Sequence, residues 1–205
     1  MTNFPVLSKA NLDTEQRRLW DTLTLGSRGF YTGGADAKRL PDLYNAWLQF
    51  PEFGQVLLRL ADALRASSNL SGKLRELVVL TTSARLGAYV EFDFHVPFAQ
   101  NEGLSDATIA ALRECAPPPF AEEEERIIYE ANLQLLRDAT LTERAREEVI
   151  ATIGFPGLIQ LIAAISLYVV TAYTTNVAKV RLADDFSADP EKLKQFFAGK
   201  QDAVD

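Results

Sequence analysis

The chain has 205 residues, of which 47% are hydrophobic, so it is long and apolar enough to bury a substantial core. Its formal net charge of −7 and sequence pI near 4.9 argue against a nucleic acid partner, because phosphate binding needs clustered Lys and Arg side chains. Cys115 is the only cysteine, which excludes an internal disulfide and a Cys-based zinc site.

The first predicted elements are three helices joined by polar segments. Asp13 is a suitable N-cap for a helix over residues 14–25, and Gly26 ends that helix. Residues 41–47 can form a short helix that begins at a proline. Pro51 begins a third helix, and its period predicts a core face made of Val56, Leu57, Leu60 and Leu64.

Residues 27–40, between the first two helices, have the glycine-rich composition of a loop. This loop carries Arg28, Lys38 and Arg39. The three cations could neutralise a substrate carboxylate, or they could simply be solvated charges on a connection.

Two helical patterns meet between residues 71 and 103. The first begins at Ser71 as N-cap, repeats apolar side chains at three- and four-residue spacing, and stops at Gly87. The second runs from about Tyr89 to Gly103, a natural C-terminal glycine. Pro97 removes one backbone donor from this second helix, so we expect a kink or a restart there.

The chain breaks outright at Pro117, Pro118 and Pro119, which mark the best boundary between two halves. Before the break, Ser105 caps a helix that reaches about Cys115. After it, the acidic run at residues 122–125 opens the next helix, where negative charge suits the helix dipole. Consecutive residues cannot all face one ion, so this run does not predict a metal site.

Three segments complete the chain. A capped helix is predicted over residues 142–154, and a long apolar helix over residues 156–180. The charged tail at residues 184–205 contains a predicted short helix at residues 191–197. The apolar stretch at residues 158–172 is short for a membrane span and contains polar side chains. We therefore predict no membrane partner for this helix. We expect it to be a buried central helix or a subunit-interface helix in a homo-oligomer.

The chemistry is predicted to lie in the central pair of helices. His95 is the only histidine, and Glu91 lies four residues before it, so both project from one face of the second helix. If the two helices fold back as a hairpin, Glu76 of the first helix can face this pair. Apolar neighbours predict partial desolvation of the pair: Tyr89, Phe92, Phe94, Val96 and Phe98.

A gapless alignment suggests a degenerate second copy of the hairpin, with residues 75–81 on residues 146–152. The same register pairs two site positions with less polar ones: Glu91 with Ile162, and His95 with Ser166. In that interpretation two hairpins pack face to face and the second supplies an apolar wall. Chance similarity is the alternative.

The run Arg-Glu-Leu at residues 75–77, the run YVEFDFHVP at residues 89–97 and Gly103 resemble the carboxymuconolactone decarboxylase and alkylhydroperoxidase D superfamily. In the peroxidase branch of that superfamily, a Glu on the first helix precedes a Cys-x-x-Cys and then a His four residues after the second Cys. Glu76 and His95 match this pattern, but Ala88 and Glu91 stand at the cysteine positions. The chain is therefore similar to the branch with Glu-x-x-x-His, as in gamma-carboxymuconolactone decarboxylase.

Periodicity and resemblance together predict an all-α multi-helix bundle, with one domain over residues 1–183 whose halves are residues 1–116 and 120–183. The resemblance implies a cofactor-independent carboxy-lyase that acts on a small carboxylated lactone or keto acid, with His95, Glu91 and Glu76 as catalytic residues. It also implies trimers or hexamers. Thiol-dependent alkylhydroperoxidase activity and a non-catalytic oligomeric scaffold stay open as alternatives.

No cofactor is expected. Two carboxylates and one imidazole form a known facial metal-ligand set, but that set usually has two histidines, and no glycine-rich loop has the setting of a phosphate site. The first residues lack a charged stretch followed by an apolar one, so we expect no signal peptide and a cytoplasmic protein.

Overall fold

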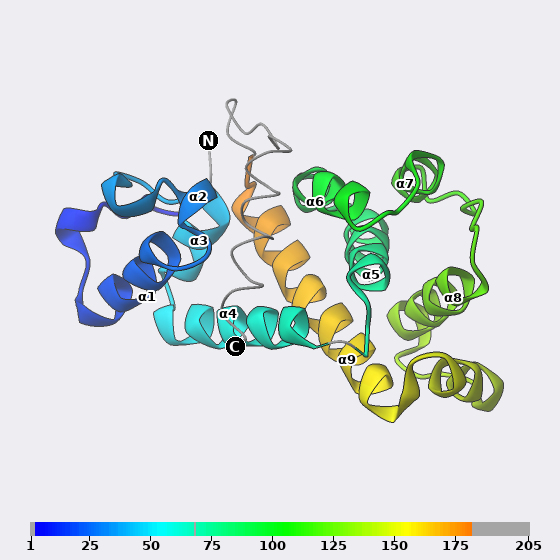
Figure 1. Ribbon diagram of the computed structural model, residues 1–205. Coiled ribbons are helices and arrows are strands. Elements are labelled where there is room, and N and C mark those ends of the chain that lie inside the picture. Colours follow the sequence, from blue (N-terminus) through cyan, green and yellow to red (C-terminus); the bar gives the residue numbers. More distant parts are fainter. Residues whose placement is uncertain (1–2, 68, 182–205) are drawn as a thin grey trace. The chain divides into compact units, whose positions relative to one another are not determined.

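The computed structural model describes residues 3–67 and 69–181, and in this part of the chain every regular element is a helix (Figure 1). The predicted all-α class is confirmed. Along the described residues the elements are η1 (Lys9–Asn11), α1 (Thr14–Leu25), α2 (Gly29–Thr32), η2 (Gly34–Asp36), α3 (Asp42–Trp47), α4 (Pro51–Ala66), α5 (Gly72–Arg85), α6 (Tyr89–Asn101), α7 (Asp106–Arg113), α8 (Glu123–Asp138) and α9 (Glu143–Ala178), where η marks a 3-10 helix. The predicted tail at residues 184–205 and its helix at residues 191–197 lie outside the described residues.

The contacts divide the chain into two compact units. In the described chain, the first comprises residues 3–58 and 174–181, and the second comprises residues 59–173. Helices α4 and α9 each run from one unit into the other, and the proline run at residues 117–119 lies inside the second. The two units therefore do not meet at the proline run, which the sequence predicted as the boundary between two halves. The single domain over residues 1–183 stays a prediction.

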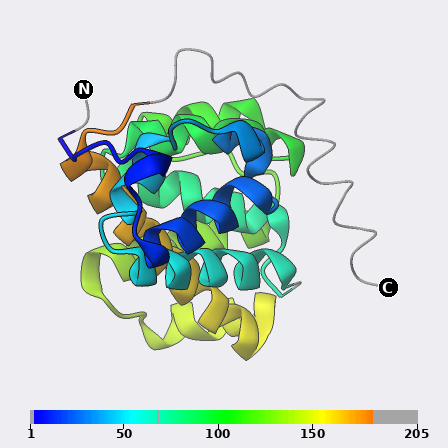
Figure 2. The same cartoon turned by 90° about the vertical axis from the view of Figure 1, so that its left-hand side faces the viewer.

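Helix α1, in the first unit, forms where its local sequence predicts it. Asp13 accepts a hydrogen bond from the backbone N–H of Gln16 at 2.8 Å, and the Gln16 side chain accepts one from the backbone N–H of Asp13 at 3.1 Å. This reciprocal cap satisfies two amides that the helix leaves without partners. Elsewhere in the unit, the backbone N–H of Asn3 donates to the carbonyl of Ala178 at 2.8 Å, so the N-terminal segment lies beside the last turn of α9 (Figure 2).

The predicted loop at residues 27–40 is wrong in part, because it contains α2 and η2. Gly33 and Gly34 have φ of 92° and 62°, a conformation that glycine adopts without steric cost, and they let the chain pass directly from one helical turn to the next. Two of the loop's cations are not free solvated charges: Arg28 is buried, and Arg39 forms an ion pair with Asp42.

The predicted core face of α4 is also wrong at Val56, which is 51% exposed. Leu57, Leu58 and Leu64 are the buried leucines of this helix. The reason lies at Gly54, where an added Cβ would meet Leu19 at 2.7 Å. Because Gly54 has no side chain, its face of α4 can approach Leu19 closely. Val56, two residues later, lies on the opposite face of the helix and is turned outward.

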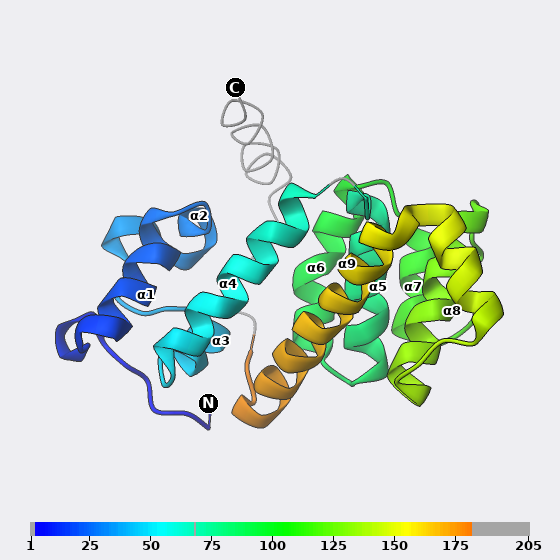
Figure 3. The ribbon, with the colours of Figure 1, turned by 90° about the horizontal axis from the view of Figure 1, so that it is seen from below.

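Helix α5 is the centre of the second unit. Residues 74–84 of this helix are all buried, and it contacts α6, α7 and α8, which pack around it in Figures 1 and 3. Ser71 caps the helix by accepting a hydrogen bond from the N–H of Leu74 at 3.3 Å. Gly87, with φ of 65°, then reverses the chain into α6. The predicted hairpin is confirmed.

Helix α6 continues through Pro97 as one helix, so the expected restart does not occur. The proline leaves the carbonyl of Asp93, four residues earlier, without its helical donor. The side chain of Asp93 also forms an ion pair with Arg113 of α7. Helix α6 also packs against α5 and α7.

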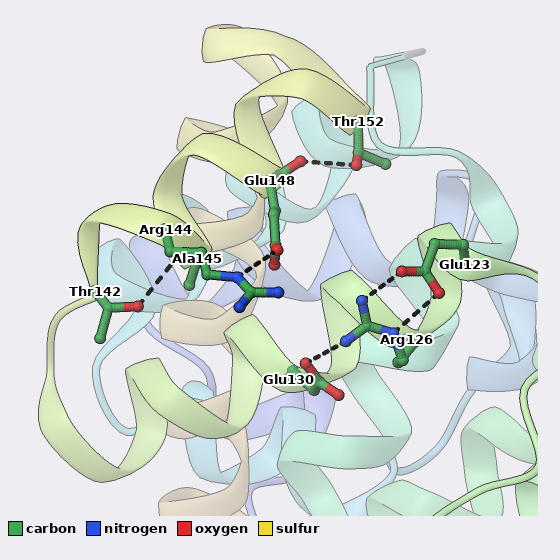
Figure 4. Close-up of polar contacts among 8 residues, drawn as sticks. All are labelled: Glu123, Arg126, Glu130, Thr142, Arg144, Ala145, Glu148 and Thr152. Carbon is green, nitrogen blue, oxygen red and sulfur yellow. Dashed lines mark hydrogen bonds and ion pairs between the residues drawn. The ribbon is translucent and has the colours of Figure 1, made fainter.

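Polar contacts join α8 to α5. Asn132 is completely buried, and its side-chain amide donates to the carbonyl of Val78 at 3.2 Å and to the hydroxyl of Thr82 at 3.3 Å. Lys73 pairs with the buried Glu125 at 2.7 Å. Other ion pairs lie on the outer sides of α8 and of the first turns of α9 (Figure 4): Arg126 with Glu123 and Glu130, and Arg144 with Glu148.

Helix α9 is interrupted at Gly154, whose φ of 71° and ψ of 174° are not helical. The predicted stop at Gly154 and restart at Pro156 are therefore confirmed. Within the described residues, α9 is the helix that is long and apolar enough to cross a membrane, and 33% of its most apolar 18-residue window is buried.

The structure does not support the gapless second copy of the hairpin. The break at Gly154 aligns on Ser83, four positions before the corresponding turn at Gly87. Ile162, Ser166 and Glu147 are exposed, whereas the residues they align with are buried. Similar helical periods produce such alignments without equivalent packing.

Candidate active site

The second unit brings together the three residues predicted to carry the chemistry. Nδ1 of His95 on α6 lies 2.7 Å from Oε2 of Glu76 on α5. Nε2 of the same ring lies 3.3 Å from Oε1 of Glu91, one turn earlier on α6. Each ring nitrogen therefore has its own carboxylate, and we call this group the Glu76–His95–Glu91 cluster.

The cluster is closed off from water. Glu76, Glu91 and His95 are 3%, 7% and 3% exposed. Phe94 lies edge-on to the imidazole at 5.4 Å between ring centres, and Phe98 lies at 5.5 Å. Tyr89, which the sequence predicted beside the cluster, is 46% exposed and has its ring near Arg113. It lies six residues before His95 and therefore on a different face of α6.

Burial and charge act in opposite directions on the imidazole. Burial, the largest influence, lowers the pKa of His95, but Glu76 and Glu91 together raise that pKa from 6.5 to about 9. Burial raises the pKa of Glu76, and the positive charges of His95, Arg75 and Arg65 more than offset it, so the pKa of Glu76 is lowered. At neutral pH the cluster is therefore an imidazolium between carboxylates.

Sequence reasoning missed a fourth group, Tyr168 on α9. Its hydroxyl lies 3.4 Å from Nε2 of His95, and the two rings meet edge-to-face at 5.2 Å. Tyr168 is buried in the stripe that α9 turns toward the core, with Leu161, Ala164, Ile165 and Ala172. A lone phenol within an apolar helical stripe was the available signal, because a buried hydroxyl needs a partner.

Arg75, the first residue of the Arg-Glu-Leu run, contacts two carboxylates. Its guanidinium Nε lies 3.4 Å from Oε1 of Glu76, and its Nη2 lies 3.6 Å from Oε1 of Glu102 at the end of α6. The Glu102 carboxylate also lies against Gly72, where a side chain would collide with it. These contacts close the open end of the α5–α6 hairpin and fix the orientation of Glu76.

The sequence also drew attention to the loop cations, to Cys115 and to a possible metal-ligand set. Arg28, Lys38 and Arg39 belong to the first unit. Cys115 follows α7 with φ of 52° and intermediate exposure. Among the described residues, no three His, Cys, Asp or Glu side chains are arranged to bind a metal ion together.

Comparison with known proteins agrees with the geometry. Residues 51–132 match the model of the carboxymuconolactone decarboxylase family, and this segment contains all three members of the cluster. Residues 51–132 belong to the carboxymuconolactone decarboxylase family. Tyr168 lies beyond the segment that matches the carboxymuconolactone decarboxylase model, so the site combines residues of that segment with one from α9.

Solved structures extend the likeness to most of the chain. One is an alkylhydroperoxidase AhpD core, a peroxidase-related protein from Ralstonia eutropha JMP134, with a TM-score of 0.71, 16% identity, and coverage of 90% of this chain and 94% of that one. Another is the debrominase Bmp8 in complex with 2,3,4-tribromopyrrole, with a TM-score of 0.65, 14% identity, and coverage of 96% and 100%. At these identities the likeness shows the fold alone, which is the alkylhydroperoxidase D-like helical architecture. No curated protein matches the chain significantly.

Proposed function

We propose that the protein is a cofactor-independent acid-base enzyme of the carboxymuconolactone decarboxylase type, acting on a small carboxylated lactone or keto acid. The observation that carries the proposal is the buried imidazole ring of His95 with a carboxylate beside each ring nitrogen. A buried, correctly oriented acid of this kind is what a carbanion or dienolate intermediate needs as its proton source.

In the proposed reaction, the bond between the substrate's carboxylate and its adjacent carbon breaks. Carbon dioxide leaves, and the electron pair stays on the substrate as a dienolate. His95 donates its Nε2 proton to the dienolate carbon and becomes neutral. Water then returns a proton to the ring, and the hydroxide left over combines with the released carbon dioxide as bicarbonate. Glu76 orients the imidazole through Nδ1, and Glu91 accepts from Nε2 in the resting state.

Positive charge around the cluster supports an anionic substrate. Arg65 and Arg75 act electrostatically on both Glu76 and Tyr168. Together with the imidazolium, these guanidinium groups offset the two carboxylates, so an incoming monoanion does not meet a site of its own charge.

Thiol-dependent hydroperoxide reduction is the second candidate, and the likeness to an alkylhydroperoxidase core supports it. That chemistry needs a thiolate beside the histidine, but Ala88 and Glu91 stand where the resemblance expects cysteines. Cys115→Ser tests this candidate. We expect that substitution to leave turnover unchanged, and loss of turnover with intact helical content would favour the thiol mechanism.

The deciding experiment is a panel of small lactone and keto carboxylates, with carbon dioxide release and ultraviolet absorbance as readouts. We expect turnover of at least one of them by the wild type and none by His95→Asn. Peroxide consumption with a dithiol would instead support the peroxidase, and loss of 2,3,4-tribromopyrrole would support a dehalogenase like the debrominase. No activity in any arm would leave the non-catalytic oligomeric scaffold.

A further inference from the structure

The Nε2 atom of His95 has two different neighbours. Glu91 presents a carboxylate oxygen at 3.3 Å, and Tyr168 presents a phenol oxygen at 3.4 Å. Both contacts are longer than the 2.7 Å contact between Nδ1 and Glu76. Nδ1 therefore has one close hydrogen-bond partner, Glu76, whereas Nε2 has two more distant potential partners.

The two neighbours of Nε2 suit different proton forms of the ring. An ionised carboxylate only accepts hydrogen bonds, so Glu91 can pair with Nε2 only while that nitrogen carries a proton. A phenol can donate, so Tyr168 can pair with Nε2 when the nitrogen presents a lone pair. For the protonated ring, the charged oxygen of Glu91 is the stronger acceptor of the two.

We propose that Tyr168 is a positioning residue for the neutral form of His95, and that its hydroxyl donates to Nε2 whenever that nitrogen has given up its proton. This assignment rests on the proposed function for the statement that His95 gives its Nε2 proton to substrate. Nε2 then exchanges Glu91 for Tyr168 while Nδ1 stays with Glu76, so the ring keeps its orientation through the proton transfer.

The environment of Tyr168 suits this task. Burial raises the pKa of Tyr168 above its usual range, so the phenol keeps its proton while the imidazole titrates. Its ring is already edge-on to the imidazole at 5.2 Å, so the exchange needs only a rotation of the hydroxyl hydrogen.

Other charged groups also face the cluster. They are Glu76 and Arg75 on α5, Glu91 on α6 and Arg65 on α4, whose charge acts on Glu76 and Tyr168. A Tyr168→Phe substitution leaves all of them in place and keeps the aromatic ring. It therefore isolates the hydroxyl.

The test uses the fact that the chain has a single histidine. Full-length protein labelled with ¹⁵N-histidine and carrying no histidine tag gives ring nitrogen signals from His95 alone. We expect Tyr168→Phe to raise the titration midpoint of that ring by about half a pH unit to one pH unit, because the neutral form loses one net hydrogen bond. Glu91→Gln should lower the midpoint, by about one pH unit or more, because the protonated form loses a close carboxylate.

A matched control is Tyr129→Phe, which removes another buried phenol of the same unit, one that accepts from Arg85 at 3.1 Å. We expect its His95 midpoint to equal that of the wild type. A midpoint in Tyr168→Phe that is unchanged or lower, with the fold intact by circular dichroism, would overturn the assignment. The titration needs no substrate, so its outcome is separate from that of the activity panel.

Discussion

At the scale of single residues, the arrangement around His95 determines which proton form the site contains. The carboxylates raise the pKa of His95 to about 9, so the imidazolium is the resting form at neutral pH. The contact of Glu76 with Nδ1 at 2.7 Å contributes to this shift of proton exchange to alkaline pH, which favours a general acid over a general base.

His95→Asn should lower the turnover rate of the identified substrate by roughly 10²- to 10⁴-fold with a modest change in KM, the range for losing a general acid. In the wild type, the rate should fall as pH rises through about 9, because the acid form of His95 disappears. Glu91→Gln should move this alkaline limb to lower pH. The measurement is kcat and KM against pH. A His95→Asn variant with nearly full activity would remove the cluster from the mechanism.

The same raised pKa predicts how stability depends on pH. A group whose pKa is higher in the folded than in the unfolded chain stabilises the fold fully below its unfolded pKa, and that contribution is lost as pH rises through the folded value. For His95 this window runs from 6.5 to about 9. The free energy of unfolding should fall across it by an amount of the order of 1–3 kcal/mol.

Urea unfolding curves at several pH values between 6 and 9.5 would measure this loss of stability. His95→Gln has no ring to titrate, so its free energy of unfolding should change less over the same range. If the free energies of unfolding of the two proteins changed equally with pH, the ion-pairing of His95 in the folded state would be contradicted.

At the scale of elements, the junction between α5 and α8 depends on a buried amide. Asn132 donates to Val78 and Thr82 from a completely buried position, so its removal leaves polar groups of α5 with fewer partners and creates a cavity. We expect Asn132→Ala to reduce the free energy of unfolding by about 1–3 kcal/mol. Chemical denaturation would measure it.

Glu130→Ala is the control for that substitution, since Glu130 lies two residues earlier on α8 and its partner Arg126 is on the outer side of the helix (Figure 4). Exposed ion pairs contribute little, because water screens them and long side chains lose entropy. The unfolding midpoint of Glu130→Ala should be close to that of the wild type. If both variants lost equal stability, the buried amide would not be the cause.

At the scale of the whole molecule, the surface of α9 predicts self-association. Phe155, Ile159, Ile162 and Tyr173 are 66%, 65%, 42% and 59% exposed, and they recur along one side of the helix. An apolar stripe of this length is costly in water and typical of a subunit contact. We therefore expect an oligomer at micromolar concentration by light scattering.

Ile159→Glu should weaken that oligomer. Leu25→Glu, at a residue of α1 that is 67% exposed, should leave it intact. A strict monomer in the wild type would contradict the prediction, and co-sedimentation with lipid vesicles would assign the stripe to a membrane surface instead.

Local sequence by itself determined most of the helices and the pairing within α6. The Asp13 cap, the turn at Gly87 and the break at Gly154 depend on side chains and dihedral angles within a few residues, so the sequence predicts them directly. Glu91 and His95 share a helix face for the same reason, because four residues make about one turn. Glu76 was predicted beside them only because a hairpin brings α5 back along α6.

Only the tertiary structure decided what surrounds these residues. Tyr168 lies 73 positions after His95, and no local period indicates that α9 brings its hydroxyl to Nε2. The exposure of Val56 depends on how closely Gly54 packs against Leu19. The pKa of His95 depends on burial competing with two carboxylates, each at a distance set by packing. Helical period is encoded within a few residues, whereas the partner that each face meets depends on contacts between segments far apart in the chain.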